Sequence, residues 1–400
     1  RKESHLVPNL RFPEFQGEWK KTTIGDIADL YKGTGISKDQ LSDDGEPCIL
    51  YGELYTKYKS ETIREVISKT NIDNTKLVRS KANDVIIPCS GETAEDIATA
   101  RCVLNGNILL GGDLNIIRLH GYDGAFMSYQ LNGRRKYDIA KVAQGVSVVH
   151  LYGEHLKGVK TINPCLEEQK KIAKLLSLLD ERIATQNKII EDLKKLKSAI
   201  IENVFDDKHS ERLQLDNVGS YIRGLTYSSN DVVEHGGTLV MRSNNIVNGS
   251  LLDYNNNVVF VNKQMSAEQQ LQNGDIVICM ANGSSSLVGK SSFYDGNWHS
   301  PITVGAFCGI YRSKEPIVKW LFQTNKYRRY IWNSLQGGNG AIANLNGEDI
   351  LNMSFSIPNA PIKDTCVKML TSVDSALENN ISLCALYTLQ KQYLLRQMFI

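Results

Sequence analysis

The 400-residue chain repeats itself, and this repeat constrains its fold more than any other feature. Short motifs of the first half recur in the same order in the second half, at first 191, then 192 and finally 194 residues further along. The matching segments are 24–27 with 215–218, 30–33 with 221–224, 84–87 with 275–278, 144–145 with 336–337, 153–154 with 347–348, and Pro164 with Pro358. The chain is therefore expected to contain two copies of one structural design.

Each copy begins with a part that the sequence predicts to be globular and α+β. Runs of β-branched residues bounded by Gly, Asn and Asp are typical of strands joined by tight turns. Such runs occur at 85–87, 116–119, 258–260 and 276–278. One amphipathic helix is expected in each copy, at 124–142 and at 317–335.

The hydrophobic period changes after each of the two matched prolines. Apolar residues then alternate four and three residues apart, which is the heptad pattern of a coiled coil. The first seam is Ile172, Leu176, Leu179, Ile183, Gln186, Ile190, Leu193, Lys197, Ile200 and Val204, and the second, 194 residues later, is Cys366, Leu370, Val373, Leu377, Asn380, Cys384, Tyr387, Lys391, Leu394 and Met398. Each copy is therefore predicted to end in a helix of about 40 residues, or roughly 60 Å.

The two seams are polar at the same two places, Gln186 with Asn380 and Lys197 with Lys391. One helix alone would expose its seam to water, so the simplest solution is that the two helices pair. Copies related by a two-fold axis would pair antiparallel, and Gln186 would meet Asn380 near the midpoint, where a buried polar pair fixes the register. The alternative is two separate helices, each packed on its own globular part.

These features predict an α+β protein with an internal pseudo-two-fold repeat, in which the two long helices pair as an antiparallel coiled coil. The predicted parts are a first globular domain at 1–163, a central helical spacer at 164–206, a second globular domain at 207–357, and a C-terminal helical spacer at 358–400.

Composition restricts the class of protein further. The formal net charge is +2, so a nucleic-acid site would have to come from local arrangement. No run approaches the roughly 18 apolar residues of a membrane span, so we expect a cytoplasmic protein with no membrane partner. The eight cysteines form no C-x-x-C pair and several lie in apolar runs, which indicates reduced, buried thiols.

The sequence offers little catalytic chemistry. The segment 283–291 resembles a phosphate-binding loop, but it has five residues between its glycines where that loop has four. No G-x-S-x-G, H-E-x-x-H or G-x-G-x-x-G motif is present. His150 and His155 lie close in sequence, but histidines do not occupy the matching positions of the second copy, so solvated or capping histidines are the commoner interpretation.

Polar, Gly-rich loops recur instead at corresponding places in the two copies. Lys, Arg, Asn, Gln, Ser and Tyr hydrogen-bond base edges and phosphates, and glycine lets a backbone approach a ligand closely. Any one loop could be an ordinary turn. Four loops per copy that differ in detail favour two domains that recognise different nucleic-acid sequences. The candidate DNA-binding residues are Lys32, Gly33, Lys38, Tyr51, Ser90, Gly91 and Gln144 in the first copy, and Arg223, Gly224, Arg242, Asn244, Asn282, Ser284, Gln336 and Asn339 in the second.

The start of the first long helix carries a specific resemblance. Residues 164–173 read P-C-L-E-E-Q-K-K-I-A, and Leu178, Leu179 and Asp180 follow. Together with two divergent domains, each followed by a heptad helix, this makes the whole chain resemble the specificity subunit of Type I restriction–modification enzymes. The positions that the second copy keeps are Pro358, Lys368, Leu370 and Asp374.

The resemblance implies a non-catalytic subunit. Each globular domain would read one half of a bipartite, asymmetric site in double-stranded DNA, and the helices would set the spacing between the halves. The helices would also dock two methyltransferase subunits, joined by two restriction/translocase subunits. S-adenosylmethionine, Mg and ATP would bind those partners, while this subunit would bind no cofactor and no metal. The residues assigned to the spacer and to partner docking are Gln169, Ile172, Leu176, Leu179, Ile183, Gln186, Leu370, Val373, Leu377 and Asn380.

Two other classes of protein stay open at this point. One is a coiled-coil adaptor with two protein-binding domains. The other is a stand-alone enzyme with an unrecognised site.

Overall fold

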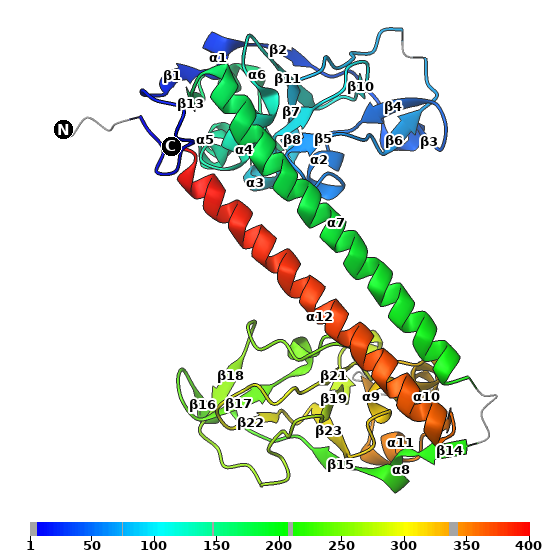
Figure 1. The fold of residues 1–400 in the computed structure, drawn as a ribbon. Coiled ribbons are helices and arrows are strands. Elements are labelled where there is room, and N and C mark those ends of the chain that lie inside the picture. The colour runs from blue at the N-terminus through cyan, green and yellow to red at the C-terminus, as the bar shows by residue number, and fades with distance from the viewer. Residues whose placement is uncertain (1–5, 74, 146–147, 207–210, 336–342) are drawn as a thin grey trace. The chain divides into compact units, whose positions relative to one another are not determined.

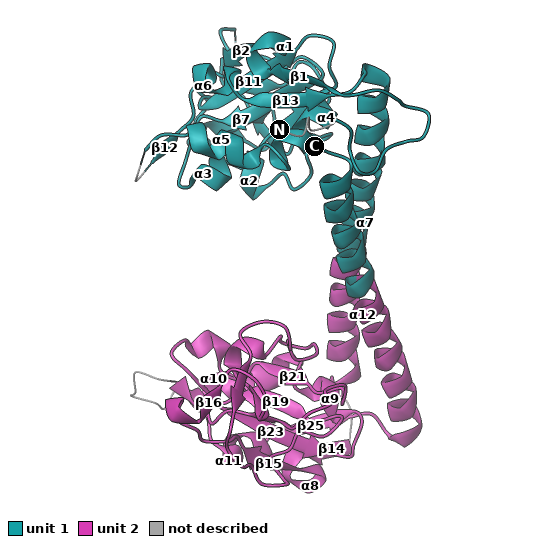
Figure 2. Ribbon diagram, turned by 90° about the vertical axis from the view of Figure 1, so that its left-hand side faces the viewer, with its two compact units in different colours: residues 1–188, 381–400 teal, residues 189–380 magenta. Residues whose placement is uncertain are grey.

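The computed structural model describes residues 6–73, 75–145, 148–206, 211–335 and 343–400 (Figure 1). The chain forms two compact units: residues 1–188 with 381–400 are unit 1, and residues 189–380 are unit 2 (Figure 2). Two long helices, α7 (Leu166–Val204) and α12 (Ala360–Gln397), contribute part of their length to each unit.

Unit 1 is an α+β unit with two main sheets. Its strands are β1 (Lys20–Thr23), β2 (Ala28–Lys32), β3 (Leu41–Ser42), β4 (Glu46–Ile49), β5 (Thr62–Ile63), β6 (Ser68–Thr70), β7 (Asp84–Pro88), β8 (Ser90–Gly91), β9 (Arg101–Val103), β10 (Leu109–Leu110), β11 (Leu114–Leu119), β12 (Val149–His150) and β13 (Lys160–Asn163). Its short helices are α1 (Ile24–Ile27), η1 (Lys38–Gln40), α2 (Glu53–Thr56), α3 (Ala94–Ile97), α4 (Gly124–Asn132), α5 (Lys136–Val142) and α6 (Gly153–Lys157). The main sheets have the orders β2-β11-β7-β9-β5 and β10-β4-β6-β3, and two small pairs are β1-β13 and β12-β8.

Unit 2 has the same kind of architecture. Its strands are β14 (Glu211–Gln214), β15 (Gly219–Arg223), β16 (Val232–Val233), β17 (Thr238–Met241), β18 (Val259–Val261), β19 (Ile276–Cys279), β20 (Ala281–Asn282), β21 (Ser291–Phe293), β22 (Ile302–Val304), β23 (Cys308–Ser313), β24 (Ala343–Asn344) and β25 (Ser354–Ile357). Its short helices are α8 (Leu215–Val218), η2 (Ser229–Asp231), η3 (Ser243–Asn245), η4 (Ser285–Leu287), α9 (Val318–Leu321), α10 (Asn325–Leu335) and α11 (Gly347–Leu351). The sheets have the orders β15-β23-β19-β21, β16-β18-β17-β22, β14-β25 and β20-β24.

The sheet orders confirm the predicted internal repeat. The order β15-β23-β19-β21 reproduces β2-β11-β7-β9, and the pairs β14-β25 and β20-β24 reproduce β1-β13 and β8-β12. All four runs of β-branched residues that predicted strands overlap strands, namely β7, β11, β18 and β19. The α+β class is therefore confirmed in both units.

The matched aspartates at the start of β7 and β19 explain part of the repeat. Asp84 is almost fully buried and receives two hydrogen bonds of 2.9 and 2.8 Å from the guanidinium of Arg118 on the neighbouring strand β11. Asp275 is bound in the same way by Arg312 of β23, over 2.8 and 2.7 Å. A buried carboxylate needs such a partner. Each ion pair therefore links two neighbouring inner strands of its sheet.

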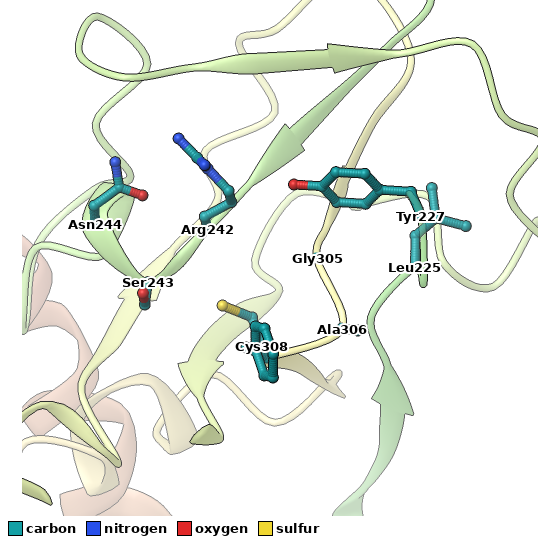
Figure 3. A pocket seen from close by; sticks show the side chains of 9 residues that line it. Leu225, Tyr227, Arg242, Ser243, Asn244, Gly305, Ala306 and Cys308 are labelled. Carbon is teal, nitrogen blue, oxygen red and sulfur yellow. The ribbon is translucent and has the colours of Figure 1, made fainter. Parts of the chain in front are cut away.

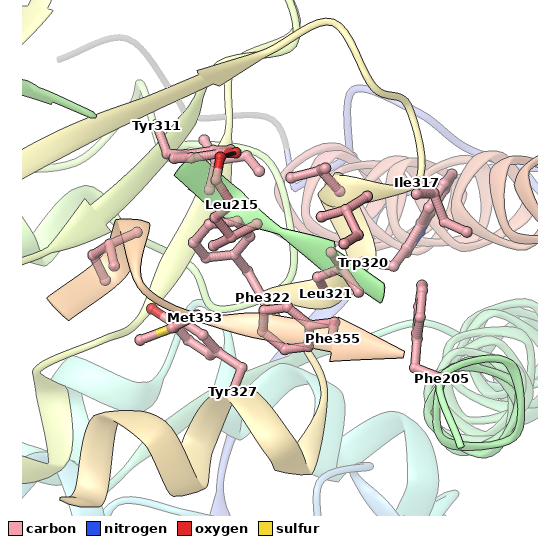
Figure 4. Packing of buried hydrophobic residues seen from close by; sticks show 14 of the residues in the cluster. Phe205, Leu215, Tyr311, Ile317, Trp320, Leu321, Phe322, Tyr327, Met353 and Phe355 are labelled. Carbon is pink, nitrogen blue, oxygen red and sulfur yellow. Dashed lines mark hydrogen bonds between the residues drawn. The ribbon is translucent and has the colours of Figure 1, made fainter. Parts of the chain in front are cut away.

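The core of unit 2 gathers aromatic side chains from several elements (Figure 4). The ring of Phe322 lies 5.3 Å from the ring of Tyr311 and 5.0 Å from that of Tyr327, measured between centroids. Phe205, which follows the end of α7, joins the same cluster. Full burial of one such ring stabilises the fold by about 1.5–3 kcal/mol, so this cluster anchors the end of the long helix.

The long helices pair antiparallel within each unit. In unit 1, Leu176 near the start of α7 and Leu394 near the end of α12 share one apolar cluster with Trp19. In unit 2, Ile201 near the end of α7 and Leu370 near the start of α12 share another. Every position of both predicted seams is buried or half-buried. The antiparallel pairing is therefore confirmed, and the alternative of two separate helices is wrong.

Of the two seam lysines, Lys197 is buried and Lys391 is half-buried, and each is paired with an aspartate of the other helix. In unit 1, Lys391 Nζ lies 2.5 Å from Asp180 Oδ1 and 2.6 Å from Glu61 Oε2. In unit 2, Lys197 Nζ lies 2.7 Å from Asp374 Oδ1. Both residues of the second pair lie 194 positions from their counterparts, so one ion pair is formed twice, once in each unit.

The predicted helices 124–142 and 317–335 are each broken into two. The first becomes α4 and α5 because the backbone leaves the helical region at Gly133, with φ −91° and ψ −105°. The second becomes α9 and α10, and the hydroxyl of Thr324 accepts the N–H of Tyr327 over 3.0 Å, which caps the new helix. Helical periodicity continued through both breaks, so it did not reveal them.

The expectation of buried thiols needs a correction at two positions. Six cysteines are buried, whereas Cys165 is exposed and Cys384 is half-buried. Cys165 precedes the first residue of α7, and Cys384 lies on a helix face that is partly open to water.

Candidate nucleic-acid surfaces

The candidate residues of each unit lie on a shared backbone arrangement, called the frame below. In it, the residue after β2 or β15 packs against the loop that precedes β11 or β23. In unit 1 the N–H of Gly33 donates to the carbonyl of Leu114 over 2.9 Å, and a Cβ at Gly33 would collide with the carbonyl oxygen of Gly111. Gly224 stands at the same place in unit 2: it donates to the first residue of β23 over 3.2 Å, and a Cβ there would collide with the carbonyl of Gly305. Both predicted glycines thus allow close approach of the unit's own backbone, which fixes the adjoining loops.

The exposed end of this frame in unit 1 carries a lysine, an aspartate and a tyrosine. Lys32 ends β2, and its Nζ lies 5.9 Å from the centre of the Tyr152 ring. Asp113 precedes β11, and its carbonyl accepts the N–H of Cys89 over 2.6 Å. Burial raises the pKa of the Cys89 thiol to about 11, while Lys32 lowers it and Asp113 raises it, so both charges lie near this cysteine. A thiol with this pKa is neutral at pH 7 and is not a nucleophile.

Further candidates of unit 1 lie on a small sheet beside these residues. Both residues of β8 are candidates, and Ser90 is opposite His150 of β12. Gln144 and His150 exchange two backbone hydrogen bonds of 2.8 and 2.7 Å. His150 and His155 each contact the ring of Tyr152, at centroid distances of 6.3 and 5.6 Å. The two histidines are therefore parts of an aromatic surface.

In unit 2 the equivalent surface is hollowed into a pocket of about 470 Å³ (Figure 3). Tyr227 and Arg242 both lie close to Gly305, since a Cβ at that glycine would be 3.5 Å from the tyrosine ring and 3.9 Å from the arginine Cγ. The lining residues are Leu225, Tyr227, Arg242, Ser243, Asn244, Gly305, Ala306, Phe307 and Cys308.

Hydrogen bonds hold the polar wall of this pocket. Arg242 Nη2 donates to the carbonyl of Asn257 over 2.9 Å, and its Nε is buried without a hydrogen-bond partner among the described residues. Asn282 Nδ2 donates to Ser243 Oγ over 3.3 Å, and the N–H of Ser284 donates to Asn282 Oδ1 over 3.0 Å. The structure therefore places Arg242 and Asn244 on the pocket wall, and it joins Asn282 and Ser284 to that wall through Ser243.

Other candidates lie elsewhere or are not placed. Lys38 lies on η1, beside the sheet that contains β3, and Tyr51 is half-buried against the apolar cluster of Leu54. Arg223 ends β15 with an exposed side chain, and its carbonyl accepts Gln269 Nε2 over 3.1 Å. The remaining two candidates, Gln336 and Asn339, lie outside the described residues.

The strand registers show that Gly91 and Asn282 are counterparts, because Asn282 pairs with Ala343 as Gly91 pairs with Val149.

Two exposed residues at equivalent places in the frame, Asp113 and Phe307, were missed by sequence reasoning. They share no chemistry, so the repeat gave no signal for them.

The candidate residues of the helices are mostly buried inside their own unit. Gln169 accepts the N–H of Asp123 over 2.9 Å and donates to the carbonyl of Pro164 over 2.8 Å, which ties the start of α7 to the domain. The buried apolar members are Ile172, Leu176, Leu179, Leu370 and Leu377, while Ile183 and Val373 are half-buried. Gln186 is buried and Asn380 half-buried; their meeting stays a prediction.

Within the described residues, no three side chains of His, Cys, Asp or Glu are arranged to hold a metal ion. The helices in that part of the chain include none with the length and apolar character needed to cross a membrane.

Comparisons with known proteins point to one family. The model of the Type I restriction modification DNA specificity domain matches residues 16–195. The specificity subunit of Type I restriction enzyme MjaVIII from Methanocaldococcus jannaschii is 29% identical over 205 residues, or 51% of this chain and 44% of that protein. The EcoKI specificity subunit of Escherichia coli is 35% identical over 155 residues, or 36% of this chain and 31% of that protein. The chain thus aligns with less than half the length of these relatives.

Solved structures share the fold over nearly the whole chain. The Type-I restriction-modification system S subunit from M. genitalium matches with a TM-score of 0.68 and 17% identity, covering 98% of this chain and 99% of that one. A chain from a structural study of type I R-M complex assembly matches with a TM-score of 0.50 and 13% identity, covering 96% and 98%. Residues 16–195 thus match the Type I restriction modification DNA specificity domain, the named relatives are specificity subunits of the same kind of enzyme, and the whole chain shares the fold of a solved S subunit.

Proposed function

We propose that this chain is the DNA sequence-recognition subunit of a Type I restriction–modification complex, in which each globular domain reads one half of a bipartite, asymmetric target. The observation that carries this proposal is that the same backbone arrangement, built twice, places different residues at equivalent positions. Lys32 corresponds to Arg223, and Gly91 to Asn282. Because different side chains select different bases, the two half-sites differ.

The paired helices act as the spacer between the half-sites and as the seat of two methyltransferase subunits. Buried ion pairs between α7 and α12 support the spacer role, because a slipped register would leave charges unpaired. The C-terminal part of α12 also exposes Leu386, Leu389 and Tyr393, each by about 60%. Exposed apolar side chains that follow one helix face favour contact with a partner.

The subunit is non-catalytic in this proposal. It works in the cytoplasm on double-stranded DNA, and two restriction/translocase subunits join the complex. S-adenosylmethionine, Mg and ATP bind to the partner subunits. The subunit itself holds no cofactor.

An exchange of domains tests the proposal. Residues 207–357 are replaced by the second recognition domain of another specificity subunit, and adenine methylation is sequenced in cells that also carry the cognate methyltransferase. One half of the methylated motif is expected to change while the other half stays. The reciprocal exchange of 1–163 is the matched control and is expected to change the opposite half. A change of both halves in either chimera contradicts modular reading.

The same experiment separates the other two classes of protein. An adaptor with two protein-binding domains would leave the methylated sequence unchanged in both chimeras. A stand-alone enzyme would turn over substrate as the purified chain without a methyltransferase.

A further inference from the structure

One position of the shared frame carries side chains of opposite chemistry in the two units. Asp113 directly precedes β11, and Phe307 directly precedes β23. The carbonyl of Asp113 accepts the N–H of Cys89 over 2.6 Å, and the carbonyl of Phe307 accepts the N–H of Met280 over 2.9 Å. Cys89 and Met280 each follow the central strand of the same sheet, β7 or β19. The two carbonyls are therefore held at equivalent places in the sheet, although only Asp113 has a left-handed backbone.

Both side chains face water although their backbones are fixed. The side chain of Phe307 is 66% exposed, while its carbonyl accepts two N–H groups at 2.9 and 3.1 Å. Asp113 is exposed and has a φ of 58°, a left-handed conformation that costs a non-glycine residue about 1–2 kcal/mol. Neither an exposed phenyl ring nor a strained backbone stabilises the unit, which points to a role outside it.

The surroundings of the two side chains show which part of DNA they suit. Asp113 shares its place beside Cys89 with Lys32, and Phe307 lines the pocket that contains Arg242 and Asn244. Lysine, arginine and asparagine bind phosphates or base edges. A carboxylate repels phosphate and a phenyl ring offers it no hydrogen bond. On a surface that contacts DNA, these two side chains therefore suit the bases.

We propose that this position reads one base in each half-site: Asp113 accepts a hydrogen bond from the N4 amino group of a cytosine, and Phe307 contacts the C5 methyl group of a thymine. A carboxylate is an acceptor only, and cytosine presents a donor in the major groove without the N7 acceptor that adenine places beside its own. Phenylalanine is suited to the thymine methyl. This inference rests on the proposed function in DNA recognition.

The thymine contact is tested by removing a single methyl group from the DNA. The half-sites come from adenine methylome sequencing with the wild-type chain, and each thymine of the second half-site is then replaced by uracil in a duplex probe. Binding is measured with the complex of the full chain and its methyltransferase subunits. One uracil is expected to weaken wild-type binding by about three- to five-fold, the equivalent of one buried methyl group. The Phe307→Ala complex binds the two probes equally.

The cytosine contact is tested by replacing one carboxylate oxygen of Asp113 with an amide nitrogen. Asparagine tolerates the left-handed conformation as aspartate does, so Asp113→Asn keeps the backbone. The amide of asparagine hydrogen-bonds the N6 and N7 atoms of adenine. Asp113→Asn is therefore expected to move the methylated motif from cytosine toward adenine at one position of the first half-site. The second half-site must stay unchanged, which shows that the variant folds.

The outcomes separate this inference from the proposed function. If the wild-type complex methylates no defined sequence, the proposed function is wrong. If the wild type is specific but its first half-site contains no cytosine or its second no thymine, the inference is wrong. It is also wrong if no uracil position distinguishes wild type from Phe307→Ala, or if Asp113→Asn leaves the first half-site as it was.

Discussion

Replacement of Lys391 by methionine tests whether the polar seam positions hold the two helices together. The change removes a cation, itself 13% exposed, from between two carboxylates of unit 1, Asp180 and Glu61, whose side chains are 9% and 11% exposed. Removal of one partner of a buried ion pair costs about 3–5 kcal/mol. Asp180 keeps hydrogen bonds from the hydroxyls of Tyr129 at 2.6 Å and Ser60 at 3.0 Å. We therefore expect a loss near the lower end, about 3 kcal/mol.

This loss is expected to depend on pH. Burial raises the pKa of Glu61, and Lys391 opposes that rise in the wild type. Without the lysine, the folded pKa of Glu61 moves further above its unfolded value. A carboxyl group with a raised folded pKa stabilises the fold at low pH, and this stability is lost as the pH rises through the folded pKa. Burial alone would lower the pKa of Lys391, but Glu61 and Asp180 raise it overall, so the wild-type lysine stays charged throughout this range. The deficit of Lys391→Met is therefore larger at pH 8 than at pH 5.5.

Urea unfolding of the whole chain, followed by far-ultraviolet circular dichroism at both pH values, measures the effect. The matched control is Lys368→Met, an exposed lysine of the same helix, which should change stability by less than about 0.5 kcal/mol. A Lys391→Met variant within about 1 kcal/mol of wild type at pH 8 would refute the reasoning. So would a deficit that grows as the pH falls.

Two further changes test the second ion pair and the backbone frame. Asp374→Asn leaves Lys197 and Lys319, whose Nζ atoms lie 2.7 and 2.8 Å from its carboxylate oxygens, facing each other without a counter-charge. Burial already lowers the pKa of Lys197. When the folded pKa of a lysine is depressed, the stability of the fold increases as the pH rises, so urea unfolding should show a smaller deficit at pH 9.5 than at pH 7. The reverse trend contradicts this role of Asp374. Gly33→Ala should cost about 2 kcal/mol or more, because its Cβ meets the carbonyl of Gly111, whereas Gly35→Ala, which has open space, should stay within about 1 kcal/mol. Equal losses in denaturant unfolding of the two alanine variants would show that the frame does not depend on Gly33.

The sequence predicted the helices better than the domains. A heptad repeat is a local pattern, so both seams could be read directly, and the polar positions Lys197 and Lys391 were visible in them. Their partners were not, because pairing with Asp374 and Asp180 depends on the antiparallel register. The breaks at Gly133 and Thr324 were also hidden, since apolar residues continue at helical spacing on both sides of each break.

The candidate surfaces could be predicted only where the two copies share chemistry. Lys32 and Arg223 are both basic and lie 191 residues apart, so the repeat revealed them. Asp113 and Phe307 lie 194 residues apart and share no property, so no motif could link them. Their equivalence became visible only through the backbone hydrogen bonds that hold both carbonyls in place.

The residues that match between the copies and those that differ have different physical tasks. Asp84 and Asp275 are buried and paired with Arg118 and Arg312, and loss of the partner of a buried carboxylate costs several kcal/mol. Phe307 is an exposed residue at the edge of the same sheet, and most exposed side chains can be replaced within about 0.5 kcal/mol. Under the proposed function, such a position can therefore change its base preference while the sheet and the helix register stay intact. Since each unit has its own exposed residues at this position, the proposed function allows one half-site to diverge without affecting the other, as an asymmetric target requires.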